Sequence, residues 1–164
     1  MKLSLKLISL ILALSALLCL CACTSRQKPK AALLPKSRGT VVFDEEQFGA
    51  DMDFTGKEKL VIIGDDKNAF HTYYYFHDDS VRLKYDNLET ELVISALPDT
   101  NLALLIYRIG NELLEGEVNW HKVEKKYVFD FKINNASCSG ECNAQGKLLS
   151  FEVPEYRVYY KAEF

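Results

Sequence analysis

The segment YVFDFKI (residues 127–133) alternates side chains with a period of two: Tyr, Phe, Phe and Ile stand at the odd positions, and Val, Asp and Lys stand between them. This is the pattern of a β-strand that buries one face, because successive side chains of a strand point to opposite sides. The carboxyl-terminal segment VYYKAEF (residues 158–164) repeats the pattern. Two such segments predict an antiparallel β-structure for the second half of the chain.

Further strands are predicted where short apolar segments are separated by Gly, Pro, Asn and Asp. The continuous apolar run Leu102–Ile109 is typical of a central strand covered on both faces, and Asp44–Asp53 could form a short helix. No stretch after Gly39 keeps an amphipathic helical period over three turns. The fold class predicted is all-β, an antiparallel β-sandwich or a partly open barrel of about 8–10 strands. The remaining predicted strands are Thr40–Phe43, Leu60–Ile63, Phe70–His77, Val81–Tyr85, Leu92–Ala96, Gly116–Trp120 and Lys147–Val153.

The composition allows one globular domain. The chain has 164 residues, of which 48% are hydrophobic and 26% are charged, and this excludes a disordered or collagen-like chain. The formal net charge of −3 is an average over unlike segments, since residues 40–164 carry 13 basic and all 23 acidic residues, a charge of −10. Such a domain is expected to avoid anionic lipid and to favour a cationic partner or simple solubility.

The first 22 residues read as a secretory signal. Lys2 and Lys6 precede an apolar stretch of 16 residues that ends at Ala22. That stretch is shorter than the ~20 residues a helix needs to cross a bilayer. A removable signal is therefore the preferred interpretation over a membrane-spanning anchor.

The residues that follow, LCAC (20–23), resemble the lipobox of bacterial lipoproteins, with Leu three positions before the cut and a small Ala just before it. The resemblance implies that the signal is removed before Cys23 and that Cys23 receives a diacylglycerol. Cys19 and Cys21 are poorer acceptors because the large residues Leu18 and Leu20 precede them. The alternative is an ordinary cut, with all three cysteines belonging to the signal. The resemblance to a lipobox implies a lipid-anchored protein of the bacterial cell envelope. If the source has two membranes, Thr24 after Cys23 favours the outer membrane, facing the periplasm.

Residues 23–39 are expected to form a lipidated, basic and flexible tether. From Thr24 onward this segment carries five basic residues, no acid and the prolines Pro29 and Pro35. The charges either contact anionic lipid head groups or serve a solubilising linker. Nucleic acid is not expected as a partner, because an exported lipoprotein would rarely meet it.

Cys138 and Cys142 flank the sequence SGE and are predicted to form a disulfide within a hairpin loop, as paired cysteines usually do in an oxidising compartment. The alternatives are a redox pair and a metal site. Redox catalysts usually have two intervening residues rather than three, and zinc would need two more ligands, with no histidine within fifteen residues. No metal or other cofactor is expected.

The strand predicted over Phe70–His77 offers a candidate binding face. By parity, His71, Tyr73, Tyr75 and His77 share one side, while Phe70, Thr72, Tyr74 and Phe76 would face the core. The two histidines would lie ~20 Å apart, too far to bind one ion. The face could recognise a sugar or a protein, or it could belong to an ordinary half-buried strand. Trp120 is most simply a core residue.

Four segments together look like the pattern of small β-sandwich lipoproteins of the secretion-pilotin type: Ala96–Asp99, Tyr127–Phe131, Gly146–Phe151 and Tyr156–Val158. This resemblance implies a sandwich fold, and the insert around Cys138 and Cys142 departs from it. No catalytic elbow, zinc-protease motif, dinucleotide fingerprint or phosphate loop occurs in the chain, so no enzyme activity is predicted. The sequence therefore favours a non-catalytic, lipid-anchored module that binds or assembles an envelope protein. The alternative is a lipoprotein that binds a ligand such as a sugar or a lipid, or that inhibits a cationic enzyme.

Overall fold

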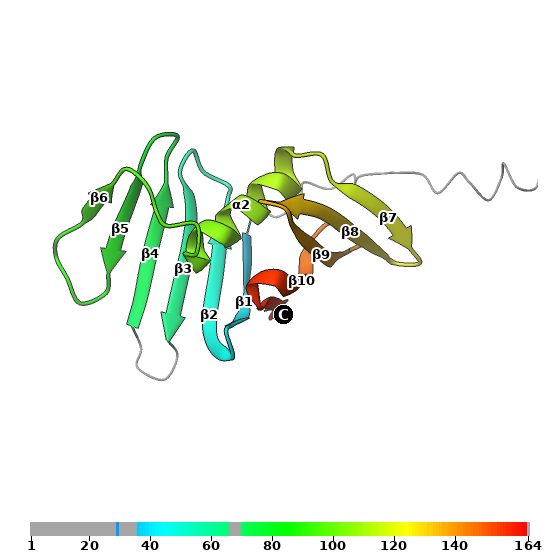
Figure 1. Ribbon diagram of the computed structural model, residues 1–164, viewed down its shortest axis with the longest axis horizontal. Coiled ribbons are helices and arrows are strands. Elements are labelled where there is room, and N and C mark those ends of the chain that lie inside the picture. The colour runs from blue at the N-terminus through cyan, green and yellow to red at the C-terminus, as the bar shows by residue number, and fades with distance from the viewer. Residues whose placement is uncertain (1–28, 30–35, 66–69, 164) are drawn as a thin grey trace, which may run out of the picture.

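The computed structural model describes residue 29 and residues 36–65 and 70–163, so the predicted signal and Cys23 lie outside the described residues (Figure 1). The described chain folds into eleven β-strands, one α-helix and a short 3₁₀-helix. The elements are β1 (Lys36–Phe43), β2 (Glu46–Asp53), β3 (Lys59–Asp65), β4 (Phe70–Phe76), β5 (Val81–Tyr85), β6 (Leu92–Ile94), α2 (Leu102–Glu115), β7 (Asn119–Val123), β8 (Lys126–Ile133), β9 (Ala136–Asn143), β10 (Leu148–Val153), η1 (Pro154–Tyr156) and β11 (Val158–Ala162).

All strands belong to one open antiparallel sheet with the order β6-β5-β4-β3-β2-β1-β11-β10-β9-β8-β7. The first and last strands pair in its middle, from Gly39 opposite Ala162 to Phe43 opposite Val158. The strands of the two halves run in different directions (Figure 1), as strand twist accumulates across a wide sheet. The predicted all-β antiparallel fold is confirmed, with eleven strands rather than 8–10.

The helix α2 corrects two predictions. Leu102–Ile109 was expected to be a central strand, and no amphipathic helix was expected after Gly39, yet residues 102–115 form a helix of almost four turns. Asn101 caps it by accepting a hydrogen bond from the Leu104 N–H at 3.0 Å. The buried side chains recur every three or four residues, so the apolar run is the core-facing stripe of a helix. These residues are Leu102, Ala103, Leu105, Ile106, Ile109, Gly110 and Leu113.

The segment Asp44–Asp53 forms a turn and the strand β2 rather than a helix, so that prediction is wrong. Asp44 and Glu45 both have positive φ, 48° and 71°, and they join β1 to β2. Two successive residues of positive φ match the twist of a tight antiparallel hairpin, and Asp tolerates that conformation better than most residues. The turn thus directs the chain straight back into a second strand.

The core lies between α2 and one face of the sheet. Phe76 of β4 stacks on Tyr107 of α2 at 4.0 Å between ring centroids. Gly110 lets the helix approach closely, since a Cβ at that position would lie 2.5 Å from the ring of Phe54. In the middle of the sheet Phe151 stacks on Tyr160 at 5.0 Å. The contacts of Tyr107 and Gly110 attach the helix to the side of the sheet that faces away from the predicted binding residues.

Other boundaries shift by a few residues. The predicted strand Val81–Tyr85 matches β5, whereas Gly116–Trp120 overlaps only the start of β7. β1 begins at Lys36, so residues 36–39 of the predicted tether are strand. Within the described part of the chain, no helix has the length and apolar character needed for a membrane span.

Candidate functional site

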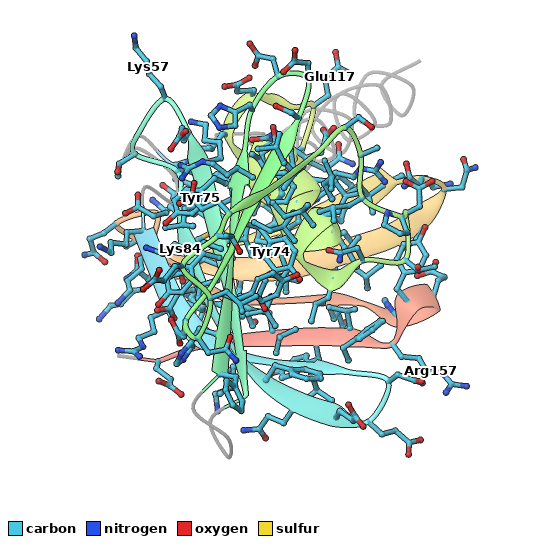
Figure 2. The ribbon with its side chains drawn as sticks, turned by 90° about the vertical axis from the view of Figure 1, so that its left-hand side faces the viewer. Lys57, Tyr74, Tyr75, Lys84, Glu117 and Arg157 are labelled. Atoms are coloured by element: carbon cyan, nitrogen blue, oxygen red, sulfur yellow. The ribbon has the colours of Figure 1, made fainter. Side chains whose placement is uncertain are left out.

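The outer face of the sheet, opposite α2, carries an aromatic and charged surface on β4 and β5. His71, Tyr73 and Tyr75 occupy alternate positions of β4. In the register of β4 with β5, Tyr75 lies opposite Arg82 and Tyr73 lies opposite Lys84. Tyr75 and Lys84 point to the outer side and Tyr74 to the side of α2 (Figure 2). These five outward residues, His71, Tyr73, Tyr75, Arg82 and Lys84, are called the tyrosine face below.

At one end of the tyrosine face, Asp86 holds His71. The Asp86 Oδ2 atom lies 2.8 Å from His71 Nδ1 and accepts the backbone N–H of His71 at 3.1 Å. The Tyr73 hydroxyl also hydrogen-bonds Asp86. The hydrogen bond from His71 is the main cause that lowers the pKa of Asp86, and the hydrogen bond from Tyr73 lowers it further. The Asp86 carboxylate in turn raises the pKa of Tyr73. Asp86 therefore stays ionised and fixes the orientation of the imidazole.

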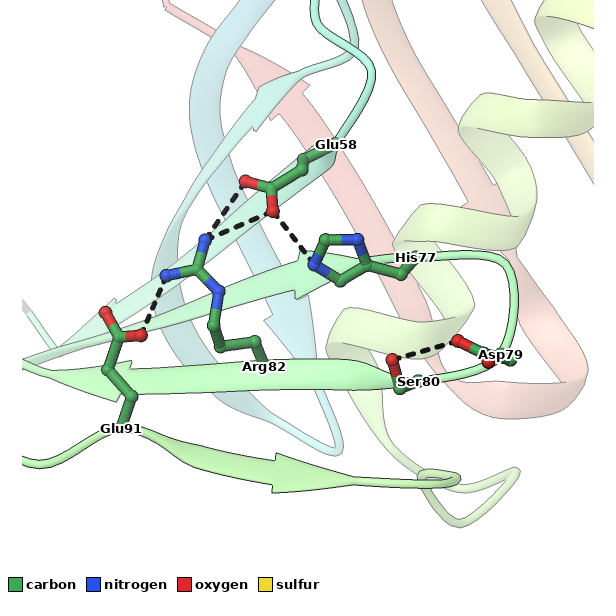
Figure 3. A network of polar contacts seen from close by, with 6 residues as sticks. All are labelled: Glu58, His77, Asp79, Ser80, Arg82 and Glu91. Atoms are coloured by element: carbon green, nitrogen blue, oxygen red, sulfur yellow. Dashed lines mark hydrogen bonds and ion pairs between the residues drawn. The ribbon is translucent and has the colours of Figure 1, made fainter.

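At the other end, Arg82 lies between two carboxylates (Figure 3). Its Nη1 donates to Glu91 Oε2 at 2.9 Å, and its Nη2 donates to Glu58 Oε2 at 3.0 Å. Glu58 also contacts His77 Nε2 at 2.9 Å. The Arg82 guanidinium carbon lies 4.0 Å from the ring centroid of Tyr75, a cation–π arrangement. Arg82 and Tyr75 are thus held together in a defined geometry.

Beside the tyrosine face, two hollows open on the outer side of β1–β4. The smaller one, of about 70 Å³, is lined by residues that include Asp51, Gly64 and His71. The larger, of about 320 Å³, is more open and shares Arg38 and Asp51 with it. Burial raises the pKa of Asp51, although the neighbouring Arg38 opposes the shift. Hydrogen bonds from Thr55 lower the pKa of Asp53 at the rim of the larger hollow.

The parity predicted for β4 is largely confirmed. His71, Tyr73 and Tyr75 lie on the outer face, while Tyr74 and Phe76 pack against the core. Phe70 was expected to be a core residue, but its side chain is 56% exposed at the start of the strand. His77 follows the last residue of β4, and its side chain pairs with Glu58. The two histidines therefore belong to separate clusters.

The prediction of a disulfide between Cys138 and Cys142 is wrong. Both residues lie on β9 and not in a hairpin loop, and both are buried free thiols. Four positions along a strand span ~13 Å, beyond the ~7 Å over which two Cα atoms can be bridged. Burial raises the pKa of each thiol to about 12. A protonated, enclosed thiol is a poor nucleophile, so this pair does not fit a redox site either.

Trp120 is buried on β7 and makes an edge-on contact with Phe129, as expected of a core anchor. The adjacent His121 lies at the surface, 3.4 Å from Asp130. Within residues 36–65 and 70–163, no group of three or more His, Cys, Asp and Glu side chains is placed to hold a metal ion.

The sequence did not indicate the partners that organise the tyrosine face. Glu58, Asp86 and Glu91 lie one residue outside a strand. Alternation along the strand does not predict to which side of the sheet such side chains point. Arg82 could have been found, because it alternates with the apolar Val81 and Leu83 on a strand next to β4. The position of Gly64 beneath His71 depends on strand pairing, which one sequence does not specify.

Comparison with protein-family models, with curated proteins and with solved structures finds no match to this chain.

Proposed function

We propose that the protein is a lipid-anchored envelope lipoprotein that binds a protein partner through the tyrosine face and performs no catalysis itself. The observation that carries the proposal is the stack of Tyr75 and Arg82, held between Glu58 and Glu91 on the face opposite α2. Tyrosine and arginine are among the residue types enriched at binding hot spots. Side chains that are already ordered lose little conformational freedom when a partner docks.

The anchor part of the proposal rests on the LCAC segment at residues 20–23 and its resemblance to a lipobox. A diacylglycerol on Cys23 would hold the domain at a membrane, because two acyl chains anchor stably where one does not. The charge of −10 on residues 40–164 favours a partner with a basic surface. In an envelope with two membranes, Thr24 after Cys23 favours the outer membrane.

The hollow of about 320 Å³ beside the tyrosine face favours a second candidate, a lipoprotein that binds a small ligand. Its volume reaches only the lower end of the ~300–1,000 Å³ typical of ligand pockets. A protein surface therefore fits the site better than an enclosed small molecule.

The test uses the full chain, extracted from membranes in mild detergent and immobilised through a carboxyl-terminal tag, to capture proteins from the source envelope. We expect one envelope protein to be enriched by the wild type and lost with Tyr75→Ala. Tyr159→Ala is the matched control, because Tyr159 is a 46% exposed tyrosine on β11, in the other half of the sheet. Equal capture by the wild type and the Tyr75→Ala variant would overturn the proposal for this face.

The anchor is tested separately by fractionation of the wild type and a Cys23→Ser variant. We expect the wild type to remain with membranes through a high-salt wash and to enter the detergent phase, whereas Cys23→Ser does neither. A wild type released by salt alone would contradict a lipid anchor, since salt screens charge but leaves acyl chains buried.

A further inference from the structure

The smaller hollow on the outer face lies over two glycines of neighbouring strands. It is a recess of about 70 Å³ between β1 and β4, with Gly49 and Gly64 side by side in the register of β2 and β3. Neither residue has a side chain to fill the space, so polar groups from the surrounding strands reach the recess. Those that line it are Arg38, Asp51, His71 and Glu163.

His71 rests directly on Gly64. A Cβ at position 64 would lie 2.8 Å from the Nε2 atom of His71 and closer still to Cδ2, so glycine is needed for the imidazole to lie where it does. The edge of the ring that carries Nε2 therefore borders the recess.

The other ring nitrogen is already committed. Nδ1 of His71 lies 2.8 Å from the Asp86 carboxylate, which can only accept, so Nδ1 carries a proton. In the neutral imidazole this leaves Nε2 with its lone pair as a hydrogen-bond acceptor. Asp86 thus turns His71 into an oriented acceptor at the wall of the recess, in the way that carboxylates orient histidine ligands elsewhere.

Two carboxylates provide further hydrogen-bond acceptors at the recess. Asp51 projects from β2, and Glu163 follows β11, where its N–H donates to the Arg38 carbonyl at 2.9 Å. The groups that act on Asp51 are Arg38 and Lys36 of β1, the carboxylate of Glu163 and, when its imidazole is protonated, His71 of β4. Arg38 is the one cation that lines the recess among the described residues, and its Nε lies 3.6 Å from Asp51 Oδ1. With a side chain 77% exposed, Arg38 is held loosely and can move away into water.

We propose that the recess binds a primary ammonium group, that of a lysine side chain on the protein partner. An ammonium has three donors and no acceptor, which matches the acceptors of Asp51, Glu163 and His71 Nε2. The three acceptors come from β2, from β4 and from the residue after β11, so they suit the rotatable donors of a compact ammonium better than the coplanar donors of a guanidinium. The inference rests on the proposed function, because it names the chemistry that the partner presents next to the tyrosine face.

The test titrates the full-length protein in detergent with Nα-acetyl-lysine N-methylamide and follows the amide NMR signals of Gly49 and Gly64. We expect saturable shifts at both glycines. The corresponding norleucine amide keeps the aliphatic chain without the charge and should give none. The arginine amide should bind at least tenfold more weakly than lysine. Equal responses to lysine and norleucine, or arginine binding as tightly as lysine, would overturn the proposal without any variant.

Two variants locate the effect. Asp51→Asn should weaken lysine binding at least tenfold, and Arg38→Gln should strengthen it several-fold because the competing cation is gone. Glu152→Gln, on β10 in the other half of the sheet, is the matched control and should leave binding unchanged. A dispersed amide spectrum confirms that each variant is folded. Unchanged affinity in a folded Asp51→Asn variant would contradict the assignment to this recess.

The inference and the proposed function can fail separately. If partner capture depends on Tyr75 but the recess does not bind lysine, the lysine site is wrong and the proposed binding function stands. Saturable lysine binding in the recess, together with partner capture that ignores Tyr75, would keep the recess and remove the tyrosine face as the docking surface.

Discussion

The Phe76 ring on β4 lies 4.0 Å from the Tyr107 ring on α2, with the two ring planes only 3° apart. The residue before Phe76, Tyr75, points to the opposite side of the same strand and stacks with Arg82. β4 therefore has one side fixed to the helix and one side available to a partner. The helix supports the candidate binding face from behind, without contributing a residue to it.

Replacing Phe76 with alanine should destabilise the fold strongly. Its side chain is buried, and its removal costs both transfer free energy and the stacked contact with Tyr107, so we expect the free energy of unfolding to fall by ~3–5 kcal/mol. Phe70→Ala is the matched control on the same strand, and its exposed ring predicts a change within ~0.5 kcal/mol. Urea denaturation measures both, and similar losses from the two variants would contradict the assignment of faces on β4.

The strands could be predicted from the sequence where one face is buried, because period two is then visible. β5, β8 and β11 are of this kind. The helix was missed because the run Leu102–Ile109 is apolar at nearly every position, so its period is hidden. Two signals pointed to a helix: Asn101 at the capping position and a run richer in Leu and Ala than in β-branched residues.

The candidate site was predicted only in part for a related reason. Alternation along β4 placed His71, Tyr73 and Tyr75 on one face, because that depends on a single strand. Their partners come from strand ends and from neighbouring strands, so they depend on pairing across the sheet. The cysteines were misplaced because SGE between them resembles a turn, whereas Gly140 lies within β9 opposite Phe129 and Phe151.

The thiols of Cys138 and Cys142 should be almost inert in the folded protein. With pKa values of about 12, only roughly one thiol in 10⁴ is ionised at pH 8, compared with about a quarter at the ordinary pKa of ~8.5. Alkylation by iodoacetamide should therefore be at least a thousandfold slower than in denaturant, where both residues react fully. Peptide mapping assigns the modified sites, and a mass two daltons lower that is restored by reductant would instead reveal a disulfide.

Stability should fall in alkaline solution. Burial raises the pKa values of Cys138, Cys142 and Tyr160 to about 12, so above their ordinary values the unfolded chain loses protons that the folded chain retains. The unfolded state is then favoured, by ~1.4 kcal/mol per pH unit for each group between its unfolded and folded pKa. For the thiols this loss begins near pH ~8.5, and for Tyr160 near pH ~10.

The Cys138→Ala/Cys142→Ala double variant checks the origin of this slope. Between pH 8.5 and 10 its free energy of unfolding should depend on pH less steeply than that of the wild type, whatever its absolute stability. Urea denaturation at a series of pH values gives both slopes. Identical slopes would show that the thiols titrate normally and are not buried as described.

The hydrogen bond between Ser37 and Tyr160 provides the last prediction. The two hydroxyl oxygens lie 2.8 Å apart, and Ser37 is only 2% exposed, between strands that meet at the centre of the sheet. Tyr160→Phe should cost ~1–3 kcal/mol, because it leaves the Ser37 hydroxyl buried without this partner. Adding Ser37→Ala removes the orphaned group, so the double variant should be no less stable than Tyr160→Phe alone. A double-mutant cycle in urea measures the coupling, and strictly additive losses would mean that the two hydroxyls do not interact.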